Sequence, residues 1–227
     1  MSHLITFLII AAIIGISIYS WYQQQKRQKE LFAWAQSKGL NYFPGHSYSM
    51  DGRFPELKVL RQGENRYAYN VIQGRYAERE MVAFDYHYET YSRDSKGRRQ
   101  THHHHLSMVV LESSVPLKPL FIRPEGFLDK IAEFFGMDDI DFESAEFSRK
   151  FFVKADDRKW AYDVIHTRTM EFLLAQPRYT IQFNPLTVAA WRTSLFKVAD
   201  YEAAAETVRG ILERLPEYVI KQLKERV

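Results

Sequence analysis

The chain begins with one uninterrupted apolar stretch. The segment from Leu4 to Tyr22 contains no charged residue, and about 20 apolar residues in a helix cross the roughly 30 Å hydrocarbon core of a bilayer. Such a span must be helical because lipid offers the backbone no hydrogen-bonding partners. We therefore predict that residues 1–22 form a transmembrane anchor, through which the protein is held in a membrane.

Basic residues flank this stretch on one side only. No Lys or Arg precedes it, whereas Lys26, Arg27 and Lys29 follow at once. The positive-inside bias then predicts a single-pass protein of the inner (cytoplasmic) membrane, with its N-terminus outside and its C-terminal domain in the cytoplasm. The alternative is a cleaved signal peptide, which the missing basic n-region and the missing A-x-A-like site disfavour.

After the anchor, the pattern changes from helical to alternating. Residues 23–38 are polar with apolar positions near their end and are followed by Gly39, which indicates a juxtamembrane helix that continues the anchor. Residues 41–55, rich in Gly, Pro, Ser and Asn, indicate a loop. Alternating apolar and polar positions then predict strands at 57–63, 66–76, 79–92, 101–113 and 119–124. Short turns between them predict an antiparallel β-meander.

The second half of the chain mixes both patterns. Helices are predicted at 125–135 and 158–176, the latter capped by Asp156 or Asp157, and strands near 147–154, at 178–183 and at 187–193. Apolar residues at helical spacing predict a long amphipathic helix over 200–227, kinked or restarted at Pro216. The fold class is therefore α+β. Residues 39–227 are predicted to form one compact cytoplasmic domain, β-rich over 39–124 and mixed α/β over 125–227.

Composition excludes several functions. The 31 basic and 28 acidic residues leave a formal charge of only +3, too small to indicate a nucleic-acid partner. There is no cysteine, so disulfides and thiol chemistry are excluded. The sequence contains no G-x-S-x-G, GxxxxGK[ST] or G-x-G-x-x-G motif. We therefore predict no catalytic or cofactor-binding residue, and a protein that is not an enzyme.

The candidate chemistry lies in a histidine-rich hairpin. If residues 94–97 form the turn, His104 faces His87 and His102 faces Glu89 across the two strands. His87, Glu89, His102 and His104 then share one face and are predicted as possible ligands of a divalent transition metal such as zinc, copper or nickel. A shift of one residue would place His103 and His105 beside His87 instead.

Two other interpretations of this hairpin need no metal. A hairpin with one solvent-exposed face carries polar side chains on that face whether or not it binds a metal. The spacing of its histidines also matches no known zinc motif. Clustered imidazoles would also repel one another when protonated, which would make the hairpin responsive to pH between about 5 and 7.

Four segments of the chain can be compared with the sequence pattern of a known family. They are FDYHY at 84–88, RPE at 123–125, GMDDIDFESAEFSRKFFV at 136–153 and DVIHTRTMEFLL at 163–174. Together they resemble a broad bacterial family of small membrane-anchored proteins of unknown function. The resemblance implies a common fold and an N-terminal membrane helix, and it implies no activity and no site residue.

These observations favour an interaction module over an enzyme. We expect the cytoplasmic domain to bind a protein partner in the membrane or the membrane surface. Anionic lipid headgroups would suit the basic turn RDSKGRR at 93–99. The alternative is a metal-binding or pH-sensing protein that uses the histidine-rich hairpin.

Overall fold

The computed structural model describes residues 2–126 and 140–225, and its first element is a single long helix. Helix α1 runs without a break from Ser2 to Ser37, so the predicted anchor and juxtamembrane helix are one element. It is long and apolar enough to cross a membrane, and none of its most apolar window is buried against the rest of the protein. An exposed apolar surface of this extent along one helix is what a lipid-embedded segment presents, which supports α1 as a membrane anchor.

The other end of α1 belongs to the domain. Leu31, Trp34 and Ala35 are buried in the core, and the helix stops at Gly39, whose φ of +69° is the left-handed conformation of a helix C-terminus. The amide of Leu40 then donates to the carbonyl of Ala35 at 2.8 Å. One helix thus joins the predicted bilayer directly to the hydrophobic core.

The domain is built on a single antiparallel sheet of eight strands, in the order β1-β2-β3-β4-β8-β7-β5-β6. The strands are β1 Asn41–Phe43, β2 Glu64–Tyr76, β3 Arg79–Arg93, β4 Arg99–Glu112, β5 Leu120–Pro124, β6 Phe151–Lys154, β7 Thr180–Phe183 and β8 Thr187–Arg192. The predicted meander is confirmed in β2, β3 and β4. The strand predicted to continue it, β5, pairs with β6 and β7 instead, because β8 and β7 lie between it and β4. Strands from both halves of the chain join in this one sheet, and the α+β fold class is confirmed.

Both faces of the sheet are covered. On β3, Met81 and Ala83 point into one core and the alternate residues Val82 and Phe84 into another, as the two-residue period of a strand requires. We call the first the α1 face, because the end of α1 and the later helices pack on it, and the second the α2 face. The α2 face is covered by the short helices α2 Met50–Arg53 and η1 Lys58–Arg61.

The helices of the second half pack on the α1 face. They are α3 Ala145–Lys150, α4 Arg158–Val164, α5 Thr167–Ala175, α6 Val198–Glu213 and α7 Glu217–Lys224. Asp157 caps α4 by accepting from the amide of Trp160 at 3.0 Å, as predicted. The predicted break at Pro216 is also confirmed, because this residue separates α6 from α7.

Four local predictions were wrong, and one lies outside the described residues. Residues 41–55, predicted as a loop, contain the strand β1 and the helix α2. Residues 57–63 contain the 3₁₀ helix η1 rather than a strand. Residues 147–150 belong to helix α3, which Ser144 caps, and only β6 is extended. The helix predicted over 158–176 is two helices, because the chain breaks at His166, whose Nε2–H donates to the carbonyl of Arg214 at 3.0 Å. Most of the helix predicted over 125–135 lies in residues 127–139, which the structure does not describe.

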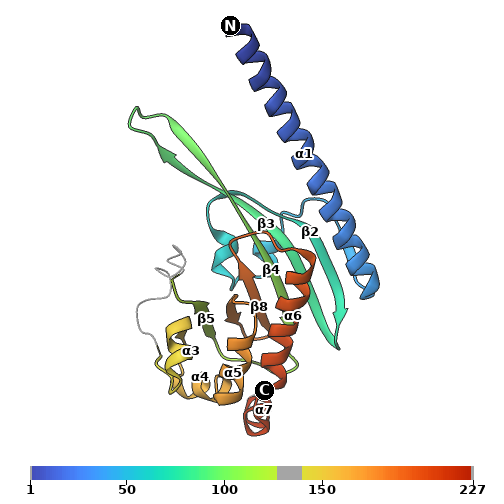
Figure 1. Ribbon diagram of the computed structural model, residues 1–227. Helices are drawn as coiled ribbons and strands as arrows, with labels where there is room; N and C mark the ends of the chain where they lie inside the picture. The colour runs from blue at the N-terminus through green and yellow to red at the C-terminus, as the bar shows by residue number, and fades with distance from the viewer. Residues whose placement is uncertain (1, 127–139, 226–227) are drawn as a thin grey trace.

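One part of the sheet projects from the rest of the domain. The hairpin of β3 and β4 extends well beyond the other strands, on the same side of the domain as the apolar half of α1 (Figure 1). Its side chains are buried up to Tyr88 on β3 and from Leu106 onward on β4, whereas most beyond these points are exposed. We call residues 89–103 the distal hairpin.

Candidate functional site

A buried ion pair ties α1 to the sheet. The guanidinium of Arg27 donates two hydrogen bonds to the carboxylate of Asp85, one of 2.6 Å to Oδ2 and one of 2.9 Å to Oδ1. The same guanidinium donates to the carbonyl of Phe196 at 2.9 and 3.1 Å. Asp85 is fully buried. A bidentate ion pair of this kind fixes both the distance and the relative orientation of the two side chains. Helix α1 therefore cannot rotate freely relative to the domain.

The remaining lone pairs of Asp85 are also occupied. Asn70 donates to Oδ2 at 2.8 Å, and Tyr201 and Ser107 donate to Oδ1, Tyr201 at 2.6 Å. Ser107 also accepts from the amide of Phe196 at 2.9 Å. A carboxylate surrounded by donors in this way has a structural role, and it has no lone pair left to act as a general base. We call Arg27, Asn70, Asp85, Ser107 and Tyr201 the Asp85 cluster.

The surroundings of Asp85 fix the charges in this cluster. Burial on its own lowers the pKa of the Arg27 guanidinium, but the hydrogen bond and charge of Asp85 outweigh it, and the net shift is upward. Burial and the charge of Asp85 raise the pKa of Tyr201 well above its usual value. Burial likewise raises the pKa of Tyr42, which donates to Asn70 at 2.7 Å, to about 12. Arg27 is therefore always charged, and both tyrosines act as neutral donors.

Sequence reasoning did not find this cluster. It placed Arg27 among the basic residues beside the membrane, and Asp85 occurred within the FDYHY segment of the family resemblance. The available signal was the position of Asp85 in the apolar run MVAFDYHY, since a charge in a strand buried on both faces requires a partner.

The register of the hairpin differs from the prediction by one residue. His87 faces His105 and Glu89 faces His103. The predicted pairs of His104 with His87 and of His102 with Glu89 are therefore wrong. The cause is the turn. Its three-residue loop, 95–97, ends at Gly97 with φ of +77°, and the Asp94 amide donates to the Arg98 carbonyl at 2.9 Å. This is the three-residue loop with a left-handed glycine, which adds one residue to a tight turn.

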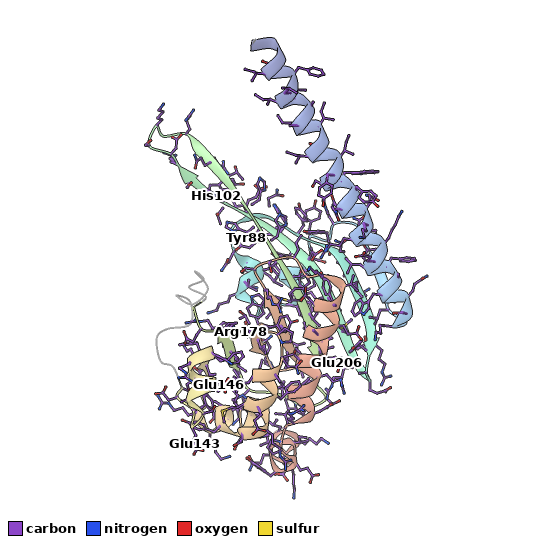
Figure 2. The ribbon with its side chains drawn as sticks, viewed as in Figure 1. Tyr88, His102, Glu143, Glu146, Arg178 and Glu206 are labelled. Atoms are coloured by element: carbon purple, nitrogen blue, oxygen red, sulfur yellow. The ribbon has the colours of Figure 1, made fainter. Side chains whose placement is uncertain are left out.

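The register divides the four consecutive histidines between the two faces. His102 and His104 lie on the α2 face, where their Nε2 atoms hydrogen-bond the hydroxyls of Ser92 at 2.7 Å and Thr90 at 2.8 Å. The ring of His104 also stacks on that of Tyr88, with centroids 4.7 Å apart. Figure 2 shows His102 on the projecting part of the hairpin, beyond Tyr88. These two histidines are therefore separated from His87 and Glu89 by the sheet itself.

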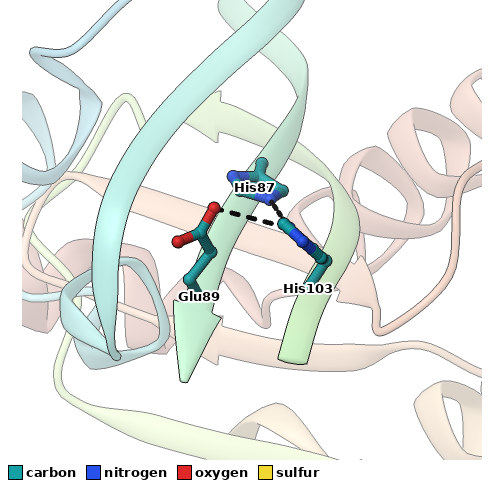
Figure 3. Close-up of side chains that lie close together, drawn as sticks. All are labelled: His87, Glu89 and His103. Carbon is teal, nitrogen blue, oxygen red and sulfur yellow. Dashed lines mark hydrogen bonds and ion pairs between the residues drawn. The ribbon is translucent and has the colours of Figure 1, made fainter. Parts of the chain in front are cut away.

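On the α1 face the hairpin brings His87, Glu89 and His103 together (Figure 3). His87 Nε2 lies 3.1 Å from His103 Nδ1, and His103 Nδ1 lies 3.4 Å from Glu89 Oε1. His87 is buried and stacks on Tyr67, with centroids 4.6 Å apart, whereas the His103 side chain is 59% exposed. Two of the four predicted ligands, His87 and Glu89, are thus brought together, and His103 replaces His102 and His104.

A groove of about 710 Å³ lies between α1 and the sheet beside the Asp85 cluster. Tyr69 and His105 contribute to its wall, and their side chains lie 3.2 Å apart. Burial and the charge of neighbouring His87 lower the pKa of His105, so its ring is neutral at physiological pH. The opposite wall is formed by α1 residues at the end of the predicted membrane span and just beyond it, including Ser20, Gln24 and Lys26.

Comparison with known proteins supports the fold. No protein-family model and no curated protein sequence matches the chain, so its resemblance to the bacterial family stays a prediction. The crystal structure of the mycobacterial trehalose monomycolate transport factor A, TtfA, is similar, with a TM-score of 0.57 and 18% sequence identity. The similarity covers 84% of this chain and 95% of that one. At this identity it establishes a shared fold.

Proposed function

We propose that this protein is a non-enzymatic, membrane-anchored accessory factor that binds a protein partner in the same membrane through its distal hairpin. The domain would lie in the cytoplasm, with α1 in the inner membrane. The observation that carries this proposal is the direction of the hairpin, which leaves the domain on the side of the membrane anchor (Figure 1). The Asp85 cluster would hold the hairpin and α1 in one fixed arrangement, which limits the conformational cost of binding.

The distal hairpin has the features of a docking element. Strand β4 pairs with β8 only over residues 107–112, and β2 reaches β3 only as far as Glu89. Within the described residues, no third strand pairs with the hairpin beyond these points. A two-stranded ribbon is only marginally stable alone, and its free edges can accept a strand from another chain. A partner at this position would be bound mainly by backbone hydrogen bonds.

The structural neighbour is consistent with this function. TtfA is described as a transport factor, which is a role in support of transport. We infer that the present chain assists another membrane protein, and we assign it no substrate.

The partner proposal predicts crosslinks from one side of the domain. A photoreactive residue at exposed Thr101 on the distal hairpin should give an adduct with a single membrane protein in native membranes. The same protein should be captured from Ile13, whose side chain is 58% exposed on α1. Tyr218 on α7 is a matched control because it is half-exposed but lies in the last helix of the domain. Equal capture from Tyr218, or none from Thr101, would contradict the proposal.

The basic tip of the hairpin supports a second candidate, contact with the membrane surface. Arg93, Lys96, Arg98 and Arg99 surround the turn, and only Arg98 is paired with an acid of the turn, Asp94 at 2.8 Å. Each basic residue near an anionic leaflet contributes about 1 kcal/mol to membrane attraction. If crosslinks from Thr101 yield lipid adducts and no protein adduct, this second function is the correct one.

The proposed orientation can be tested directly because the chain has no cysteine. A Ser2→Cys variant should react with a membrane-impermeant maleimide in intact cells. A Ser95→Cys variant, in the hairpin turn, should react only after the membrane is permeabilised. The reverse pattern would place the domain outside the cytoplasm and would overturn the predicted topology.

A further inference from the structure

The strongest candidate chemistry at the base of the distal hairpin is the cluster of His87, Glu89 and His103. Zinc binds imidazole nitrogen and carboxylate oxygen at about 2.0–2.2 Å, and two atoms so bound in a tetrahedron lie about 3.3 Å apart. The distances of 3.1 Å and 3.4 Å from His103 Nδ1 to the other two groups match this value. All three potential ligand atoms lie within 4.8 Å of one another. Little movement is needed for them to share one ion.

The tautomer of His87 suits a metal ligand. Its Nδ1 lies 3.2 Å from the backbone carbonyl of Asn65, and because a carbonyl can only accept, Nδ1 carries the proton. The lone pair of Nε2 is therefore directed at His103. A second ring nitrogen that donates to a carbonyl is the usual support of a metal-bound histidine.

Glu89 is oriented by the same neighbour. The side-chain amide of Asn65 donates to Oε1 at 2.8 Å, and the Tyr91 hydroxyl donates to Oε2 at 2.8 Å. These two hydrogen bonds hold the pKa of the Glu89 carboxyl below its usual value, so the group is charged at neutral pH. Asn65 thus contacts two of the three potential ligands, one through its backbone and one through its side chain.

Asn65 adopts an unusual backbone conformation that this role explains. Its φ is +47°, in the left-handed region, and the pairing of β2 with β3 is irregular between Glu64 and Tyr67. A bulge of this kind redirects one residue of a strand, at some conformational cost. Here it turns both the carbonyl and the amide of Asn65 toward β3.

We propose that His87 Nε2, Glu89 and His103 Nδ1 bind one divalent transition-metal ion, for which zinc is the best fit. Two imidazoles and one carboxylate leave the fourth position of a tetrahedral zinc open for water. Between His87 and His103 the ion would take the place of the proton on His103 Nδ1, and that proton would move to Nε2 of the same neutral ring. The site lies at the base of the distal hairpin and would lock its two strands together. This inference is independent of the partner proposal, since neither requires the other.

The test uses the full-length, untagged protein in detergent, freed of metal by a chelator and titrated with zinc against a competing indicator. We expect one zinc per chain. His103→Ala and Glu89→Gln should each weaken binding at least tenfold. The fold should persist, because His103 is exposed and Glu89→Gln keeps the size and shape of a partly buried side chain. Zinc should raise the melting temperature of the wild-type protein and not that of either variant.

The matched control is the double variant His102→Ala/His104→Ala, which removes two histidines of the same run from the opposite face. It should bind zinc as the wild type does. Asn65→Gly, which tolerates the left-handed backbone but lacks the amide, should weaken binding about tenfold, as loss of a supporting hydrogen bond typically does. A control variant that loses as much affinity as His103→Ala would show that the run acts as an exposed polyhistidine. Either that result or the absence of one-to-one binding would overturn the proposal.

Discussion

Replacing Arg27 with alanine is expected to destabilise the domain by about 3–5 kcal/mol, because the fully buried carboxylate of Asp85 loses its only countercharge in the cluster. Hydrogen bonds from Asn70, Ser107 and Tyr201 remain but carry no positive charge. The free energy of unfolding can be measured by urea denaturation of the full chain in detergent, followed by the fluorescence of its tryptophans. Amide exchange should also increase in the second half of α1, since its main polar contact with the sheet is removed.

Lys26 provides the control for this prediction. It is adjacent to Arg27, carries the same charge and is 59% exposed, with Glu30 4.0 Å away. Lys26→Ala should change stability by less than about 0.5 kcal/mol. The double variant Arg27→Ala/Asp85→Asn removes the unpaired charge and should be about 1–2 kcal/mol more stable than Arg27→Ala alone. If Arg27→Ala costs no more than Lys26→Ala, the ion pair does not couple the anchor to the domain.

Replacing Gly63 with alanine is the second change with a large expected effect, a loss of about 3 kcal/mol. Gly63 has φ of +61°, and an added Cβ would overlap the backbone carbonyl oxygen of Glu89 and come within 3.0 Å of the Tyr88 ring. A backbone carbonyl of a paired strand cannot move aside as a flexible side chain does. The new methyl group should therefore push β3 away from the start of β2, and the denaturation midpoint should fall accordingly.

A substitution at Gly97 distinguishes the steric contribution to this loss of stability from the conformational one. Its φ of +77° is also left-handed, but an added Cβ would have nothing within 4 Å. Gly97→Ala should therefore cost only the conformational part, about 1–2 kcal/mol. If Gly63→Ala and Gly97→Ala lower the free energy of unfolding equally, the close approach of Gly63 to Glu89 contributes nothing to the loss of stability.

Local patterns were sufficient for the elements whose cause is local. The span of the anchor follows from the thickness of a bilayer. The strands β2, β3 and β4, each more than ten residues long, follow from stretches rich in aromatic and β-branched residues, part of which alternate with polar ones. Asp157 and Pro216 marked helix boundaries because capping and the missing proline amide act within one turn. The short elements were less predictable, since η1 and α3 have too few residues to establish a period.

The candidate sites depended on information that no local pattern contains. The choice between His102 with His104 and His103 with His105 depended on one backbone angle, the left-handed φ of Gly97, because a shift of one residue exchanges the faces of a strand. Arg27 and Asp85 are 58 positions apart, and only the packing of α1 against β3 shows that they form one pair. The sequence by itself thus determined the anchor, the fold class and the hairpin. The tertiary structure decided which side chains meet, because contacts between distant segments depend on how the strands and helices pack together.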